Sequence, residues 1–180
     1  RYKNPIIHHN DVFLAVSQSG ETADTIEAMK EIHEKGGKVY GICNVVSSTI
    51  ARISDGGAFI HAGPEIAVAS TKAFSNTLIV YYLLALKFAR QRGMGKEDGS
   101  KFIKELQGQP ALIKKALSCK EKIREIAKKY CKCKDFLFLG RGIMYPIALE
   151  GALKLKEISY IHAEAFAAGE IKHGPIAMVN

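Results

Sequence analysis

The sequence predicts an α/β fold with parallel strands, because short apolar runs alternate with helical patterns from residue 11 to residue 92. Each of these runs ends in a turn that is rich in hydroxyl side chains. After a helical connector, a further apolar run at 135–139 starts the alternation again. We therefore expect a three-layer αβα domain with a parallel sheet, followed by the beginning of a second domain of the same kind.

The first repeat is a strand at 11–16, a polar turn at 17–22 and a helix at 22–35. Two glycines follow the helix and end it. A strand that leads into a helix leaves backbone N–H groups pointing at the turn, and Gly20 allows another molecule to approach closely. The side chains that could donate to a phosphate are Ser17, Gln18, Ser19 and Thr22. The same residue types are also ordinary helix caps, so both interpretations remain open.

The unit then repeats twice. Residues 38–43 form a second strand, followed by Asn44 and a hydroxyl cluster, and residues 57–61 form a third, followed by the turn 63–71. A long helix continues to about residue 92, and we expect it to be a core helix that is too short in its apolar part to span a membrane. Because the turns after parallel strands gather at one sheet edge, the three polar turns predict a site for a small anionic molecule.

The domain organisation follows from a change in composition after residue 92. Residues 1–92 form the first domain, and 93–134 form a linker, Gly-rich at 93–100, with connector helices that Pro110 interrupts. Residues 135–180 begin the second domain. Each boundary is a prediction from patterning alone.

Composition excludes several classes of protein. The 180 residues carry a net charge of +8, but the lysines between 101 and 134 alternate with Glu121 and Glu125, which indicates a solvated surface rather than a nucleic-acid site. The 47% hydrophobic and 24% charged residues are typical of a globular chain. The four cysteines fit neither a disulfide framework nor a zinc site, so we expect reduced thiols in a cytoplasmic protein and no bound metal.

A helix that Pro146 opens carries three charged residues on one face, Glu150, Lys154 and Glu157, at spacings of four and three. Such a stripe is either an ion-pair ladder in water or part of a catalytic site. Beyond this helix, His173 lies in a Gly-Pro loop, where a histidine can transfer protons near neutral pH or be an exposed bystander.

Three stretches together resemble a known family. They are 17–25 (SQSGETADT), 63–74 (GPEIAVASTKAF) and the run from 148 to 175 that ends in KHGP. The first is similar to sugar isomerase (SIS) domains in general. The last two resemble the isomerase part of the glucosamine-6-phosphate synthase family, the glutamine:fructose-6-phosphate amidotransferases.

The resemblance implies two SIS domains in a homodimer that, without a cofactor, convert fructose 6-phosphate to glucosamine 6-phosphate with ammonia from glutamine. It implies that the phosphate is held by Ser17, Gln18, Ser19 and Thr22, and that the sugar lies along Val68, Ala69 and Ser70. It implies that Glu157 is the base that moves a proton between C1 and C2, that Lys154 assists, and that His173, contributed by the partner subunit, helps to open the sugar ring.

The chain also departs from the family. Compared with the family pattern, we expect these 180 residues to lack the glutaminase domain, the first βα unit of the first SIS domain and the family's Schiff-base lysine. We therefore expect a piece of the enzyme. The alternative is a noncatalytic SIS module that senses a sugar phosphate. A dinucleotide-binding domain is disfavoured, because no G-x-G-x-x-G follows a strand.

Overall fold

The computed structural model describes residues 4–179, which form two compact units. The first unit contains the chain as far as Ile66 together with Thr71–Ile103. The second contains the short segment Ala67–Ser70 and the chain from Lys104 onward. Each unit has a parallel sheet of its own, so the mixed α/β class is confirmed.

The sheet of the first unit has three parallel strands in the order β1 (Val12–Ser17), β2 (Lys38–Cys43) and β3 (Gly56–Phe59). The predicted strands are confirmed, although β3 ends two residues earlier than expected. Helices α1 (Ala23–Glu34) and α2 (Thr49–Ile53) follow β1 and β2. The carboxyl ends of the strands therefore lead into the three polar turns.

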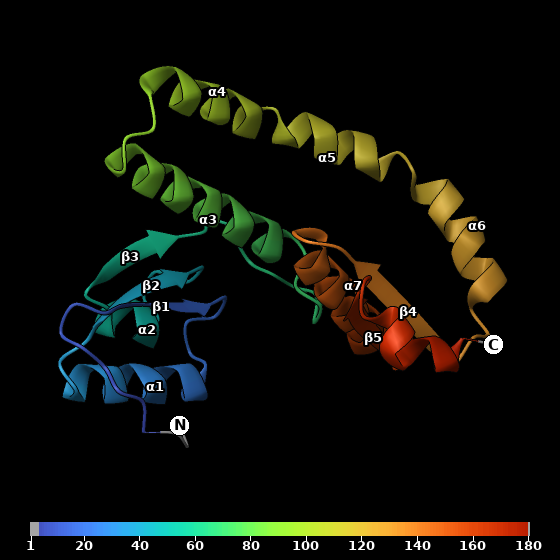
Figure 1. The fold of residues 1–180 in the computed structure, drawn as a ribbon, viewed down its shortest axis with the longest axis horizontal. Coiled ribbons are helices and arrows are strands. Elements are labelled where there is room, and N and C mark those ends of the chain that lie inside the picture. The colour runs from blue at the N-terminus through green and yellow to red at the C-terminus, as the bar shows by residue number, and fades with distance from the viewer. Residues whose placement is uncertain (1–3, 180) are drawn as a thin grey trace. The chain divides into compact units, whose positions relative to one another are not determined.

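Helices cover both faces of this sheet (Figure 1). On one face, Met29 of α1 and Ile50 of α2 are buried against Val39 of β2. On the other face, α3 (Lys72–Gln91) buries Ala73 against Ile42. The first unit is thus the three-layer αβα arrangement that the sequence predicts.

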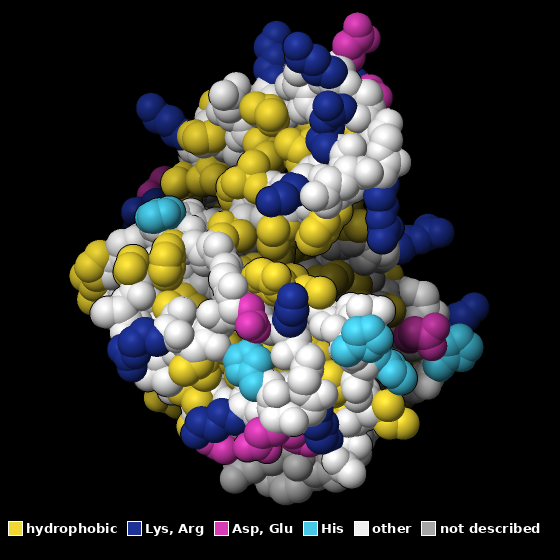
Figure 2. Space-filling model, turned by 90° about the vertical axis from the view of Figure 1, so that its left-hand side faces the viewer, with side chains coloured by type: hydrophobic (Ala, Val, Ile, Leu, Met, Phe, Trp, Pro, Cys, Tyr) yellow, Lys and Arg dark blue, Asp and Glu magenta, His cyan; other side chains and the backbone are white. Residues whose placement is uncertain are grey.

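Helix α3 is less buried than the core helix we expected. Of its residues only Ala73 is buried, and Leu83 retains 49% of its accessible surface. An open groove of about 420 Å³ runs between α3 and the sheet, lined by apolar side chains that include Leu14, Tyr40 and Phe88. Figure 2 shows hydrophobic side chains gathered in a band on this side of the molecule. The apolar helix α3 therefore packs against the sheet along only one narrow stripe of its surface.

The predicted linker at 93–100 is wrong in its second half, because α4 (Lys96–Gln107) begins there. Glu97 and Asp98 occupy its first turn, where the helix dipole favours acidic side chains. Gly99 is buried, and a Cβ built on it would lie 3.1 Å from the side chain of Arg90 on α3. This glycine permits close helix packing rather than flexibility.

The connector continues as α5 (Gln109–Leu117) and α6 (Lys120–Tyr130), with Pro110 in the first turn of α5. Neither helix has a buried residue, in agreement with a solvated lysine-rich surface. The apolar side chain of Ile123 on α6 is also exposed. Within residues 4–179, no helix combines the length and apolarity that crossing a bilayer requires.

In the second unit β4 (Asp135–Gly140) pairs in parallel with β5 (His162–Ala167), and α7 (Met144–Ser159) connects them. Strand β5 is not among the strands expected from the sequence. Short 3-10 turns follow, at Ile171–His173 and at Pro175–Met178. The second unit thus contains one complete strand-helix-strand crossover between parallel strands.

Candidate functional site

The hydroxyl groups of the Ser17–Thr22 turn organise the turn itself. Ser17 Oγ accepts the N–H of Gly20 at 3.0 Å and lies 2.8 Å from Thr22 Oγ1, with which it shares a hydrogen bond. Ser19 Oγ accepts the N–H of Glu21 at 3.2 Å. Thr22 is the N-cap residue of α1, but its side chain makes no capping hydrogen bond. The capping interpretation therefore does not describe Thr22.

Gly20 is required by the shape of this turn. Its φ is +68°, in the left-handed region that favours glycine. A Cβ at this position would lie 2.1 Å from the hydroxyl oxygen of Ser48, which is buried and caps α2 through the N–H of Ala51. The turn after β1 thus rests directly on the start of α2.

Two further contacts join the first turn to the second. The carboxylate of Glu21 accepts the N–H of Thr49 at 2.7 Å, and this bond holds the pKa of Glu21 below its usual value. The backbone N–H of Asn44 donates to the carbonyl of Gln18 at 3.1 Å. The phosphate turn predicted from sequence is therefore fixed to the carboxyl end of β2.

Asn44 also holds the third turn. Its side-chain N–H donates to the carbonyl of Gly63 at 2.6 Å, and its side-chain oxygen accepts the N–H of Ala62 at 2.9 Å. The three turns that we expected to converge are thus joined by hydrogen bonds at one sheet edge. In the sequence, the only signal for this role of Asn44 is its position directly after the apolar run 38–43.

The residues predicted to lie along the sugar differ in exposure. Val68 retains 90% of its accessible surface, Ala69 retains 2%, and Ser70 is half-buried. All three belong to the short segment that is grouped with the second unit. Within this segment Ala69 is therefore buried, while the Val68 side chain is exposed.

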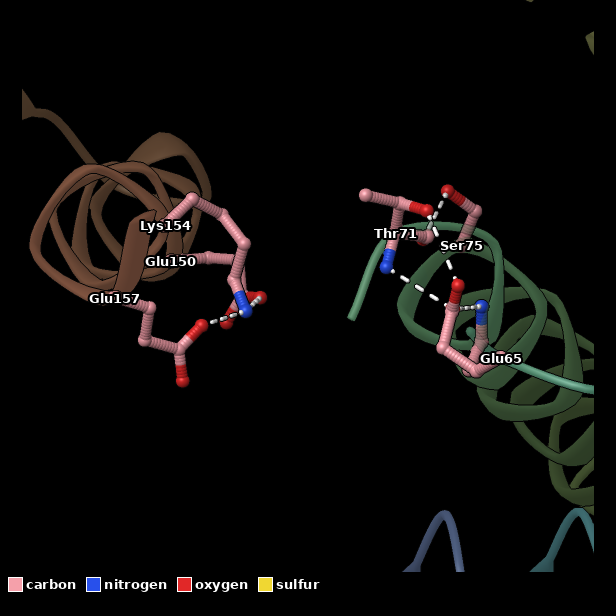
Figure 3. A network of polar contacts seen from close by, with 7 residues as sticks. Glu65, Thr71, Ser75, Glu150, Lys154 and Glu157 are labelled. Atoms are coloured by element: carbon pink, nitrogen blue, oxygen red, sulfur yellow. Dashed lines mark hydrogen bonds and ion pairs between the residues drawn. The ribbon is translucent and has the colours of Figure 1, made fainter. Parts of the chain in front are cut away.

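On α7 the ammonium group of Lys154 lies between two carboxylates (Figure 3). Its Nζ is 2.7 Å from Glu157 Oε2 and 3.3 Å from Glu150 Oε1. Partial burial of Lys154 acts to lower its pKa, but the hydrogen bonds to Glu157 and Glu150 outweigh it and raise the pKa above the usual value. The sequence placed Glu150 on this face without giving it a role.

The opposite side of α7 explains why this face points away from the sheet. Ala148 and Ala152 are buried, and a Cβ on Gly151 would lie 3.0 Å from the ring of Phe138 on β4. Small residues therefore let α7 pack closely against its own strand. The three charged side chains are each less than one-third exposed, so they do not form a fully solvated ladder.

His173 lies at the end of the first 3-10 turn and is exposed. Its backbone N–H donates to the carbonyl of Glu170 at 3.0 Å. Within residues 4–179, no hydrogen bond or ion pair joins its side chain to Lys154 or Glu157. The second unit thus brings together Lys154 and Glu157 but not His173.

The four cysteines and the possible metal ligands do not add a further site to the described residues. All four cysteines carry free thiols, and burial raises the pKa of the Cys43 thiol. In the part of the chain that the structure describes, no group of three or more His, Cys, Asp or Glu side chains is placed to hold a metal ion.

The chain is similar in sequence to several known proteins. Over 181 aligned residues, which include all of this chain, it is 53% identical to the glutamine–fructose-6-phosphate aminotransferase (isomerizing) of Methanosarcina mazei and 48% identical to that of Bacteroides thetaiotaomicron. It spans 29% and 30% of those two relatives.

The structure also resembles the C-terminal domain of glucosamine-fructose-6-phosphate aminotransferase from Francisella tularensis, with a TM-score of 0.96 and 42% identity. That match covers 99% of this chain and 51% of the other. The sequence pattern of the SIS domain matches residues 2–87 and 129–180, which include the Ser17–Thr22 turn and the Lys154–Glu157 pair. This chain therefore belongs to the SIS domain family.

Proposed function

We propose that this chain is the isomerase part of a glutamine–fructose-6-phosphate aminotransferase. The observation that carries the proposal is the Lys154–Glu157 pair, a half-buried carboxylate with an ammonium group 2.7 Å away. The similarity of the whole chain to relatives of that name supports it. A noncatalytic sugar-phosphate sensor would need the phosphate turn but has no use for this pair.

The phosphate of the substrate would bind at the turn after β1. Ser17, Gln18, Ser19 and Thr22 supply neutral donors there, and α1 begins immediately beyond them without a side-chain cap from Thr22. The sugar would then lie along the segment Val68–Ser70. These assignments rest on the resemblance of the motifs and on the convergence of the three turns.

The chemistry requires one base. Ammonia condenses at C2 of open-chain fructose 6-phosphate with loss of water, which gives an imine. Glu157 then takes a proton from C1 and returns one to C2, while the C1 hydroxyl loses its proton and the imine nitrogen gains one, which leaves an aldehyde at C1 and the amino group at C2. Lys154 orients the carboxylate. His173, supplied by a partner subunit, would transfer a proton to or from the ring oxygen when the sugar opens.

The organisation of the complete protein is part of the proposal. We assign 1–92 to a first SIS domain, 93–134 to a connector and 135–180 to the start of a second SIS domain. Ammonia would come from a glutaminase domain of the same polypeptide. We also infer a homodimer in the cytoplasm.

The experiment is to incubate the complete polypeptide that carries this chain with fructose 6-phosphate and glutamine, and to detect the product by mass spectrometry. We expect glucosamine 6-phosphate. Binding of fructose 6-phosphate without any product would support the sensor instead. If the polypeptide neither binds fructose 6-phosphate nor forms product, both functions are contradicted.

A further inference from the structure

The loop that leads from β3 to α3 is fixed at both ends. At its start, the side chain of Asn76 donates to the carbonyl of Ile60 at 3.0 Å, and Asn44 binds the next residues as described above. At its end, Glu65 binds the first turn of α3. Under the proposed function this loop carries the residues that contact the sugar.

Glu65 makes three hydrogen bonds to two residues (Figure 3). Its Oε2 accepts the backbone N–H groups of Thr71 at 3.1 Å and of Ala73 at 3.0 Å. Its Oε1 lies 3.4 Å from the hydroxyl of Thr71. The bonds from Ala73 and then Thr71 hold the pKa of Glu65 below its usual value, so this side chain is a carboxylate at neutral pH.

These bonds replace a helix cap that the local sequence does not provide. Thr71 is the N-cap residue of α3, but its φ of −123° and ψ of −76° are unusual and its side chain makes no capping bond. Glu65, six residues earlier, supplies the acceptor instead. The backbone from 66 to 70 is therefore closed into a small loop by a side chain at its own beginning.

The closed loop is where the predicted sugar contacts lie. Within this loop Ala69 is buried, while Val68 is exposed. Without Glu65 the loop would lose the hydrogen bonds that join its two ends, so more of its backbone would have to be ordered when substrate binds, and that ordering costs conformational entropy. The phosphate turn would not share this cost, because it is fixed through Asn44, Glu21 and the start of α2.

We propose that Glu65 is a positioning residue, which holds the backbone of Val68–Ser70 in the conformation that binds the sugar portion of the substrate. The inference rests on the proposed function, because it takes the loop to be a sugar-contact loop. It assigns to Glu65 no contact with substrate and no proton transfer. Its effect should therefore appear in binding of the sugar and not in binding of the phosphate group alone.

The test uses two probes, fructose 6-phosphate and inorganic phosphate, titrated calorimetrically into the complete polypeptide. The variants are Glu65→Ala, Glu65→Gln and a matched control, Glu97→Ala, which removes an exposed carboxylate from the first turn of α4. We expect Glu65→Ala to weaken fructose 6-phosphate binding about tenfold and to leave inorganic phosphate binding unchanged. Glu65→Gln keeps an acceptor oxygen and should restore most of the affinity, and the control should match the parent.

Three results would overturn the role of Glu65. One is unchanged fructose 6-phosphate binding in Glu65→Ala, and another is an equal loss for both probes, which would mean general damage to the fold. The third is a Glu65→Gln variant as weak as Glu65→Ala. If the parent bound neither probe, the proposed function itself would fail, and the role of Glu65 with it.

Discussion

Lys154 and Glu157 lie on adjacent turns of α7 with 2.7 Å between Nζ and Oε2. The ammonium group also lies 3.3 Å from Glu150, so it is held from both sides and its position along the helix is fixed. A base that must reach both C1 and C2 of a sugar needs a fixed carboxylate. The ion pair with Lys154 restrains the Glu157 carboxylate in this way, which supports the role proposed for it.

Replacing Lys154 should slow the chemical step. In Lys154→Met the carboxylates of Glu150 and Glu157 lose the cation between them and repel each other, so Glu157 leaves its productive position. We expect kcat for isomerisation of fructose 6-phosphate to glucose 6-phosphate to fall about a hundredfold, with a smaller change in KM. Lys156→Met, at an exposed position of the same helix, is the control. Equal rates for the two variants would show that Lys154 has no part in the reaction.

Ser17→Ala should weaken binding through the phosphate. It removes one of the proposed donors to the phosphate, together with the bonds that Ser17 Oγ makes with the N–H of Gly20 and with Thr22 Oγ1. We expect about a tenfold loss of affinity for both fructose 6-phosphate and inorganic phosphate, measured by calorimetry. Ser118→Ala, at an exposed hydroxyl on the connector, should bind both as the parent does. An unaffected Ser17→Ala variant would remove the phosphate from this turn.

Gly20→Ala should destabilise the fold more than Gly36→Ala. Both glycines have positive φ, at +68° and +80°, so each substitution introduces backbone strain of about 1 kcal/mol. A Cβ at Gly36 meets no atom within 4 Å, whereas at Gly20 it meets Ser48 at 2.1 Å. We expect about 3 kcal/mol of destabilisation for Gly20→Ala in urea unfolding, because the clash adds to the strain. Similar values for the two variants would mean that the turn does not rest on α2.

Acid should destabilise the first unit through its bound carboxylates. Asp55 accepts the N–H of Val39 at 2.8 Å and lies 3.0 Å from His33 Nε2, and the bond from Val39, followed by that from His33, lowers the pKa of Asp55. The pKa values of Glu21 and Glu65 are lowered as well. Such groups stabilise the fold above their unfolded pKa of about 4, and this stability is lost as pH falls through the lower folded pKa.

We therefore expect their contribution to the free energy of unfolding to be constant above about pH 5 and to decrease below about pH 4. Urea unfolding, followed by circular dichroism at stepped pH, measures it. Asp55→Asn keeps an acceptor for Val39 but does not titrate, so its curve should be flatter in acid. A parent and variant with the same acid slope would contradict the role of Asp55.

Local patterns predicted most of the first unit. The strand of 38–43 was bounded correctly, because an apolar run lies between polar turns that stop it. By contrast β5 was missed, because its sequence, HAEAFA, is rich in alanine and lacks β-branched residues. Its strand conformation depends on pairing with β4, which no local pattern reveals. The helical start at Lys96 was missed for a related reason, since Gly99 looked like a linker residue and is a packing residue.

In the candidate site too, some features could be predicted from local sequence and others could not. The turns could be placed at one sheet edge from topology, and Glu150, Lys154 and Glu157 on one helix face from spacing. Hydrogen bonds between distant residues could not be found this way. The Asn44 side chain bonds to backbone groups 18 and 19 residues away, and Glu65 caps a helix across a loop of irregular backbone.

The proposal that Glu157 is the base is tested most directly by isomerisation of fructose 6-phosphate to glucose 6-phosphate, measured with the complete polypeptide carrying Glu157→Gln. We predict a rate at least about a hundredfold below the parent, with affinity for fructose 6-phosphate kept. Glu121→Gln, at an exposed carboxylate on α6, should keep the parental rate. Full activity of Glu157→Gln with unchanged substrate binding would contradict the catalytic assignment.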